Sequence, residues 1–233
     1  MHSLSIVIPA FNEEQRLPDT LERITRWLAG KSWDEVEILV VDDGSKDKTA
    51  KFAASYGRGV HLLQNPGNRG KGYAVRHGML EATGEWVLYT DADLSAPIEE
   101  FDRLCLAATN GNAQVAIGSR ALDRSLVQVH QAAFREYSGR FFNLVMRMVT
   151  GLPFRDTQCG FKLFRREAAQ AIFSRQKLDG FSFDVEDLYI AKKLGIAVVE
   201  VPVRWSNVEG TKVSLMSGLR SFQDLALIRR LHG

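Results

Sequence analysis

The chain has 233 residues, of which 45% are hydrophobic and 25% are charged, close to the average of a globular protein. This composition excludes a disordered tail, a collagen-like fibre and a small disulfide-stapled scaffold. The 30 basic and 28 acidic residues leave a net charge of +2, which is too small for nucleic-acid binding by bulk electrostatics. The sequence has no linker rich in Pro, Gly or Ser, so we expect one domain.

The cellular setting is indicated by a few local features. Cys105 and Cys159 fit no metal-ligand spacing and favour a reducing compartment. Glu13, Glu14 and Arg16 stand too near the start for a secretory signal. No apolar run approaches the roughly 18 residues that a membrane-spanning helix needs. We therefore expect a cytoplasmic protein without a membrane span.

Short apolar runs rich in β-branched residues predict five buried strands, at Leu4–Ile8, Val36–Val41, Val60–Leu63, Trp86–Thr90 and Val115–Ile117. Between them, helical periodicity predicts helices over Leu17–Leu28 and Tyr73–Ala82. This alternation predicts an α/β fold in which helices flank a mostly parallel central sheet. Ligands of such sheets bind at the carboxyl ends of the strands.

Polar or Gly/Pro-rich segments follow all five predicted strands, at Pro9–Glu13, Asp42–Ser45, Asn65–Gly72, Asp91–Asp93 and Gly118–Arg120. Charge is also uneven along the chain. An acidic block runs from Glu81 to Asp102 without any Lys or Arg, and a basic block follows from Arg120 to Lys177. The blocks are either two solvated faces or a place where a divalent metal meets phosphate oxygens.

Two amphipathic helices are predicted after residue 125. One has an apolar face from Phe134 to Met148, and the C-terminal one has its apolar face from Leu215 to Ala226; both carry interspersed arginines. Covering the core and touching a membrane surface are equally compatible with this pattern.

Asp91-Ala-Asp93 places two carboxylates at a strand end, which suits Mg²⁺ or Mn²⁺ holding a diphosphate. Acidic loop residues also commonly cap turns. With Ser95, the motif resembles the nucleophile of haloacid-dehalogenase-type phosphatases, but there it follows the first strand, whereas here it follows the fourth. A phosphatase is therefore disfavoured.

Asn65–Gly72 resembles a phosphate loop but has Tyr73 where the Walker lysine belongs, and Val75 breaks the dinucleotide pattern. ATPases and dehydrogenases are thus disfavoured, although backbone amides and Lys71 can still approach an anion at the next helix. Asp42-Asp43-Gly-Ser is equally compatible with a helix cap and with a carboxylate that binds a base or ribose.

Five ordered motifs together carry a resemblance, namely Ile6-Val-Ile-Pro-Ala-Phe-Asn-Glu-Glu14, Val40-Val-Asp-Asp-Gly-Ser-Lys-Asp-Lys-Thr49, Asn68-Arg-Gly-Lys-Gly72, Asp91-Ala-Asp93 and Gly118-Ser-Arg120. They closely resemble those of family 2 glycosyltransferases, which have a GT-A fold. The later segments Asp156–Phe164, Phe183–Glu186 and Trp205–Lys212 look like the dolichyl-phosphate glucosyltransferase branch, near the dolichyl-phosphate mannose synthases. The resemblance implies one GT-A domain over 1–233, with a nucleotide-sugar half at about 1–120 and an acceptor-binding half at about 121–233.

The resemblance also implies roles for individual residues. The nucleotide is expected against Pro9, Ala10, Asn12, Glu13, Asp42, Lys71 and Asp91. Mg²⁺ or Mn²⁺ is expected on Asp91 and Asp93, with Asp93 a direct ligand; Ser95 replaces a metal-contacting Gln of the mannose synthases, which leaves the third ligand open. The expected catalytic residues are Asp93, Arg120, Arg135 and Lys212, of which Arg120 and Arg135, with Arg140, hold the acceptor phosphate. Asp156 and Glu186 are expected to position arginines or sugar hydroxyls.

The implied reaction is inverting transfer of glucose from UDP-glucose to a polyprenyl (dolichyl) phosphate. GDP-mannose as donor and a hydroxyl group as acceptor are the open alternatives. A lipid acceptor implies a peripheral protein at the cytoplasmic face of a membrane, with the two amphipathic helices as contacts. We also expect no anchor before the first strand.

Overall fold

The computed structural model describes residues 3–129, 143–207 and 215–233, and for Val129 and residues 215–221 it describes the backbone alone. Within these residues the strands are β1 (Ser3–Ala10), β2 (Glu35–Asp42), β3 (Val60–Gln64), β4 (Trp86–Thr90), β5 (Val115–Ser119), β6 (Val127–Val129), β7 (Phe161–Arg165), β8 (Val198–Pro202) and β9 (Trp205–Ser206). The helices are α1 (Leu17–Ala29), α2 (Thr49–Tyr56), α3 (Lys71–Glu81), α4 (Phe101–Asn110), α6 (Arg166–Phe173), α7 (Phe183–Lys193) and α8 (Leu215–His232), with short 3-10 turns η1 (Ile98–Glu100) and η2 (Arg124–Leu126). Residues 143–150 are also helical.

The central sheet confirms the mostly parallel architecture. Its described strands run in the order β3-β2-β1-β4-β7-β5-β8, with β6 and β9 forming a separate two-stranded ribbon. All five predicted strands are present, and β1 is parallel to both β2 and β4. The sheet has one reversed member, since β7 is antiparallel to both β4 and β5.

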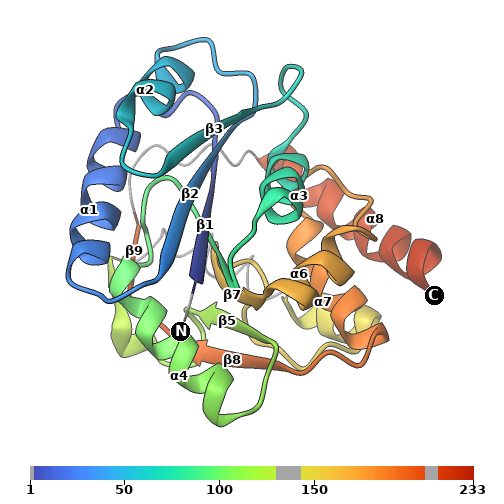
Figure 1. Cartoon of the computed structure of the whole chain (residues 1–233). Coiled ribbons are helices and arrows are strands. Elements are labelled where there is room, and N and C mark those ends of the chain that lie inside the picture. The colour runs from blue at the N-terminus through green and yellow to red at the C-terminus, as the bar shows by residue number, and fades with distance from the viewer. Residues whose placement is uncertain (1–2, 130–142, 208–214) are drawn as a thin grey trace.

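Two apolar layers cover the sheet, and side-chain alternation along the strands decides which residue enters which layer. On β1, Ile6 and Ile8 pack on the side of α1, α2 and α4, whereas Val7 packs on the side of α3, α6 and α7. Figure 1 shows these two groups of helices on opposite sides of the strands, with α8 beside α7. The predicted helices over Leu17–Leu28 and Tyr73–Ala82 correspond to α1 and α3.

Close packing of α3 on the sheet depends on a missing side chain. A Cβ on Gly78 would lie 2.8 Å from a methyl of Val41 and closer still to one of Val7. Glycine therefore lets the helix axis approach the strands, in spite of its low intrinsic helix propensity. This close packing places the start of α3, at Lys71, beside the carboxyl ends of β1 and β4.

The two late amphipathic helices are present in part. Residues 143–150 are helical, while most of the predicted Phe134–Met148 face lies outside the described residues. The predicted C-terminal helix is found as α8, where Leu225 and Ile228 are buried in the same core as Met146. Among the residues that the structure describes, no helix combines the length and the apolar character needed to cross a membrane.

Candidate active site

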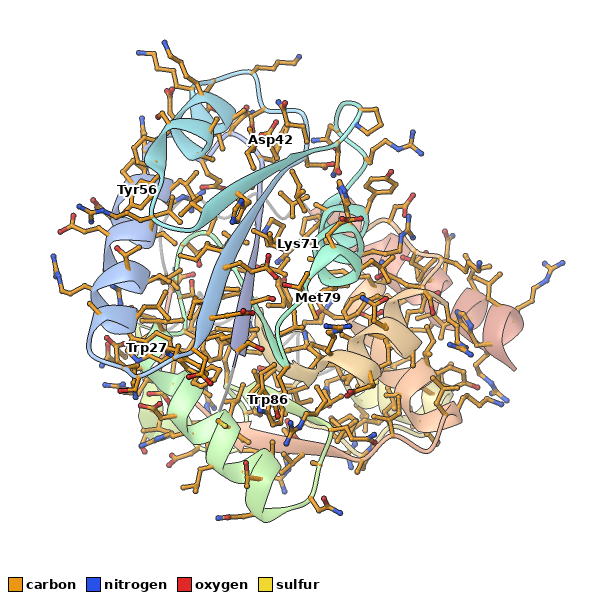
Figure 2. The ribbon with its side chains drawn as sticks, in the orientation of Figure 1. Trp27, Asp42, Tyr56, Lys71, Met79 and Trp86 are labelled. Carbon is orange, nitrogen blue, oxygen red and sulfur yellow. The ribbon has the colours of Figure 1, made fainter. Side chains whose placement is uncertain are left out.

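A pocket of about 370 Å³ lies at the carboxyl ends of β1, β2 and β4. Figure 2 shows Asp42 and Lys71 toward this end of the molecule and Trp27 and Trp86 toward the other. The lining comprises Pro9, Ala10, Phe11, Glu13, Arg16, Asp43, Asn68, Gly70, Lys71, Ala74, Asp91, Ala92, Asp93 and Phe181. Four of the five polar strand ends therefore contribute to one cavity.

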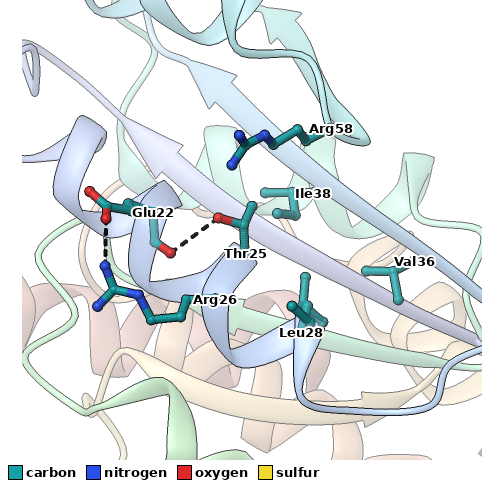
Figure 3. A pocket seen from close by; sticks show the side chains of 8 residues that line it. Glu22, Thr25, Arg26, Leu28, Val36, Ile38 and Arg58 are labelled. Carbon is teal, nitrogen blue, oxygen red and sulfur yellow. Dashed lines mark hydrogen bonds and ion pairs between the residues drawn. The ribbon is translucent and has the colours of Figure 1, made fainter.

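A larger hollow of about 610 Å³ lies between α1, β2 and Arg58, away from these strand ends (Figure 3). Its lining includes apolar side chains such as Leu28 and Ile38. The charged residues Glu22 and Arg26 on its rim are paired with each other. This hollow has a single carboxylate in its lining, that of Glu22, whereas several carboxylates converge on the pocket at the strand ends.

The predicted nucleotide residues divide into two groups. Six of the predicted nucleotide and metal residues line the pocket, namely Pro9, Ala10, Glu13, Lys71, Asp91 and Asp93. Asn12 and Asp42 do not line it. Instead, the Asn12 N–H donates to Ser45 Oγ at 2.8 Å and the Ser45 N–H donates to Asp42 Oδ1 at 3.2 Å. In this arrangement they join the loops that follow β1 and β2.

Asp43, the neighbour of Asp42, borders the pocket and also shapes it. Its carboxylate accepts hydrogen bonds from Asn65 Nδ2, the Arg69 N–H and the Gly70 N–H at 2.8 to 3.0 Å. The carboxylate thus holds the loop that leads into α3. The Asp42-Asp43 motif therefore acts in this structure as a loop organiser, one residue of which faces the cavity.

The start of α3 differs from the expectation that backbone amides there approach an anion. The Gly72 and Tyr73 N–H groups donate to the Asp179 carbonyl, at 2.8 and 3.3 Å. The Arg69 and Gly70 N–H groups are taken by Asp43. Because these four donors already have partners, positive charge at this wall comes from the Lys71 side chain.

Lys71 and Asp91 form an ion pair in the pocket, with Lys71 Nζ 2.8 Å from Asp91 Oδ1. Burial disfavours the charged lysine, but the carboxylates of Asp91 and Asp184 outweigh burial and raise the pKa of Lys71. The hydroxyl of Tyr89 donates to the same Asp91 oxygen at 2.9 Å. Burial, then Asp91 and Asp184, raise the pKa of Tyr89 well above its usual value, so it remains a donor.

A buried lysine lies next to the cluster formed by Lys71, Tyr89 and Asp91. Lys162, on β7, is 2% exposed and forms an ion pair with Asp184 of α7. Its Nζ also donates to the Cys159 carbonyl at 2.9 Å and lies 5.6 Å from the centre of the Tyr89 ring. Sequence reasoning missed Tyr89 and Lys162, although a lysine within the apolar run Phe161–Phe164 was a usable signal.

The Asp91 and Asp93 carboxylates supply hard oxygen ligands, which suit Mg²⁺ or Mn²⁺. Asp91 Oδ1 is engaged by Lys71 and Tyr89, and Asp93 Oδ1 accepts the Ser95 N–H at 2.9 Å. No cluster of three or more metal-binding side chains occurs in the described ranges. The two carboxylates fit a cation whose remaining coordination positions are filled by phosphate oxygens and water, as is usual for Mg²⁺.

The other acids of the block from Glu81 to Asp102 are not gathered at the pocket. Glu85 pairs with Arg165, Glu100 with Arg204 and Asp102 with Lys31. Only Asp91 and Asp93 of that block line the cavity.

Arg120 lies at the end of β5 and is locked to Asp156. Its Nε and Nη2 donate to the two carboxylate oxygens at 2.6 and 2.8 Å, and its backbone N–H adds a third bond. Arg120 lowers the pKa of Asp156 against the opposing effect of burial. The Arg120 side chain is 31% exposed, and its guanidinium lies 5.5 Å from the centre of the Trp205 ring. Asp156 thus positions an arginine, as expected. Arg135, Arg140 and Lys212 lie outside the described residues.

The family model for glycosyl transferase family 2 matches residues 5–173 of the chain, a range that includes Lys71, Tyr89, Asp91, Asp93 and Lys162. The chain belongs to this family. The dolichyl-phosphate beta-glucosyltransferase of Dictyostelium discoideum is 36% identical over 97% of the chain and 73% of its own length. The enzyme of that name from Drosophila melanogaster is 37% identical over 97% of the chain and 74% of its length.

The fold recurs in proteins with solved structures. Glucosyl-3-phosphoglycerate synthase from Mycobacterium tuberculosis, crystallised with Mn²⁺, UDP-glucose and phosphoglyceric acid, superposes with a TM-score of 0.71. It is 20% identical, over 97% of this chain and 78% of its own. At that identity the comparison establishes the GT-A fold, which confirms the predicted fold class.

Proposed function

We propose that this protein transfers glucose from UDP-glucose to a polyprenyl phosphate of the dolichyl type, with inversion at the anomeric carbon. The similarity to dolichyl-phosphate beta-glucosyltransferases, at 35 to 37% identity over nearly the whole chain, carries this proposal. The pocket agrees with it, because Lys71, Asp91 and Asp93 stand together at the carboxyl ends of the strands. That is where the diphosphate of a sugar nucleotide needs both charge and a metal.

The chemistry needs no strong general base. A phosphate monoester has a second pKa of about 6 and is largely dianionic at neutral pH, so it attacks the anomeric carbon without first losing a proton. The protein has to place it in line with the leaving UDP. We assign Arg120 to the acceptor phosphate, because a guanidinium suits phosphate oxygens, and Asp156 fixes the orientation of this guanidinium.

A divalent cation, when bound by Asp93 together with Asp91, would neutralise the charge that builds up on the leaving diphosphate. Lys71 contributes a positive charge at the same wall of the pocket, where the carboxylate of Asp91 holds it. The Tyr89 hydroxyl in turn donates to that carboxylate. Arg135, Arg140 and Lys212 complete the proposal as further phosphate-binding groups, on the strength of the sequence resemblance alone.

Association with a membrane surface belongs to the same proposal, because the acceptor is a lipid. Leu144 and Met148 are 54% and 69% exposed on helical residues 143–150, and Leu231 is 45% exposed on α8. Exposed Arg147 and Arg230 accompany them, which favours an anionic bilayer. Vesicles that contain anionic lipid should carry the wild-type protein into the pellet on sedimentation. A Leu144→Ser, Met148→Ser variant should remain in the supernatant. Equal sedimentation of both proteins would contradict the assignment of Leu144 and Met148 to the membrane contact.

The function is tested by incubating the protein with Mg²⁺ or Mn²⁺, polyprenyl phosphate and either UDP-glucose or GDP-mannose, and identifying the lipid product by mass spectrometry. We expect a hexosyl phosphoryl lipid from UDP-glucose and its loss on chelation of the metal. Asp93→Ala should abolish the product, whereas Asp19→Ala, an exposed carboxylate on α1, should leave it unchanged. Product formation by Asp93→Ala would refute the metal assignment, and product from GDP-mannose alone would refute the donor.

A further inference from the structure

A strap formed by residues 176–181 closes one side of the proposed nucleotide pocket. Phe181 lines the cavity and is 38% exposed. The Asp179 carbonyl accepts the Gly72 N–H at 2.8 Å, and Gln176 Nε2 donates to the Gly72 carbonyl at 3.0 Å. An ion pair of 3.0 Å between Arg76 and Asp179 adds a side-chain contact. The strap therefore caps the helix whose first residue is Lys71.

The backbones of the strap and of the start of α3 are so close that no side chain fits between them. A Cβ on Gly72 would lie 2.6 Å from the Leu178 carbonyl oxygen, and a Cβ on Gly70 would collide with the Asp179 carbonyl. Gly70 and Lys71 themselves border the pocket. These contacts keep the strap from moving toward α3, and the hydrogen bonds to Gly72 oppose its moving away. The position of Phe181 is therefore tied to that of the wall that carries Lys71.

The strap is held in turn by one fully buried carboxylate. Glu186, in the first turn of α7, accepts the Lys177 N–H at 2.9 Å on Oε1 and the Leu178 N–H at 2.8 Å on Oε2. Oε1 also lies 2.6 Å from His232 Nε2, at the end of α8. A second link joins the same parts, since the Ser182 hydroxyl donates to Asp224 of α8 at 2.6 Å.

We infer that Glu186 is a positioning residue for donor binding, which fixes the strap against α3 and couples the seating of α8 to the nucleotide pocket. Glu186 touches no pocket surface itself, so its effect passes through the strap backbone. A buried carboxylate that accepts two backbone N–H groups and an imidazole cannot be replaced by an amide, because an amide offers one acceptor oxygen and a competing donor. This inference rests on the proposed use of a uridine nucleotide.

The test compares Glu186→Gln with the wild-type protein in UDP titration calorimetry and in steady-state kinetics. We expect the Kd for UDP and the KM for UDP-glucose to rise about tenfold, which is about 1.4 kcal/mol. At saturating donor, kcat and the KM for the lipid acceptor should stay within about twofold, because the variant removes binding that is uniform between ground and transition states.

Glu37→Gln is the matched control. Glu37 also holds a loop backbone, accepting the Thr83 N–H at 2.8 Å, but it does so at the start of the strands, far from the pocket. Its substitution should lower the melting temperature and leave the Kd for UDP unchanged. His232→Gln keeps the strap bonds of Glu186 and should raise the Kd for UDP about twofold to threefold; it also provides the test if Glu186→Gln does not fold.

Each outcome has one meaning. Wild-type protein that does not bind UDP would refute the proposed function. Wild-type binding with an unchanged Kd in Glu186→Gln, or in His232→Gln where only that variant folds, would refute the positioning role. A rise in Kd equally large in Glu37→Gln would also refute it, because general destabilisation would then explain the loss.

Discussion

Gly160 lies directly against the carboxylate of Asp91. A Cβ at this position would be 2.7 Å from Asp91 Oδ1 and closer to Oδ2, whereas ordinary van der Waals contact begins at 3.4 Å. The Gly160→Ala substitution therefore forces the carboxylate to retreat by at least 0.7 Å, the difference between these two distances. The backbone can accept alanine, because Gly160 is not among the glycines with positive φ.

The retreat weakens the bonds from Lys71 and Tyr89 to Asp91, which are 2.8 and 2.9 Å long. Hydrogen bonds to charged groups contribute about 1.5–3 kcal/mol each, and a displacement of about 1 Å in a site can cost about 10²-fold in rate. We expect kcat/KM for UDP-glucose to fall about 10- to 100-fold, or about 1.4–2.8 kcal/mol.

The assay is glucosyl transfer measured over a range of UDP-glucose concentrations, with the melting temperature as a check on folding. Gly30→Ala is the control, since its Cβ would meet only the Trp27 carbonyl at 3.6 Å, and it should keep wild-type kcat/KM. If Gly160→Ala stays within twofold of the wild type, the carboxylate of Asp91 does not need the position that the structure gives it.

Further predictions concern Arg120 and Asp156. Arg120→Lys loses the two-pronged contact with Asp156, so we expect about 1–2 kcal/mol of destabilisation by urea unfolding and about tenfold lower kcat/KM; an unchanged value of both would contradict the role of the fork. The pKa of Asp156 is depressed in the folded state against about 3.9 in the unfolded state, so its stabilisation is complete above about pH 4 and is lost as the pH falls through the folded-state pKa. Asp156→Asn should therefore flatten the acid limb of stability against pH, and an acid limb identical to that of the wild type would exclude this carboxylate as its source.

The sequence was informative wherever the signal was local. The apolar run before Asp91 and the polar residues after it were enough to predict a strand that ends at a site, because ligands of parallel α/β sheets bind at the carboxyl ends of the strands. The same holds for Lys71, which follows a glycine-rich loop and begins α3.

Other parts of the site depend on partners far away in the chain. Lys162 interrupts an apolar strand, and its ion pair with Asp184 and its hydrogen bond to the Cys159 carbonyl explain how a charge is tolerated there. The amides at the start of α3 were expected to be open to an anion, but Asp179 occupies two of them. No local pattern could reveal that contact, because it is made by the fold as a whole.

The reversed strand β7 has a consequence for how the chain reaches this fold. It is the only described member of the main sheet that runs against its neighbours, and it sits between β4 and β5. Until Phe161–Arg165 emerges from the ribosome, β4 and β5 have no strand between them and their facing edges are unpaired. Unpaired edges invite association with other chains, and pairing across a long sequence separation is slow. The centre of the sheet is thus completed late in synthesis, and a fragment that ends before β7 would expose both edges.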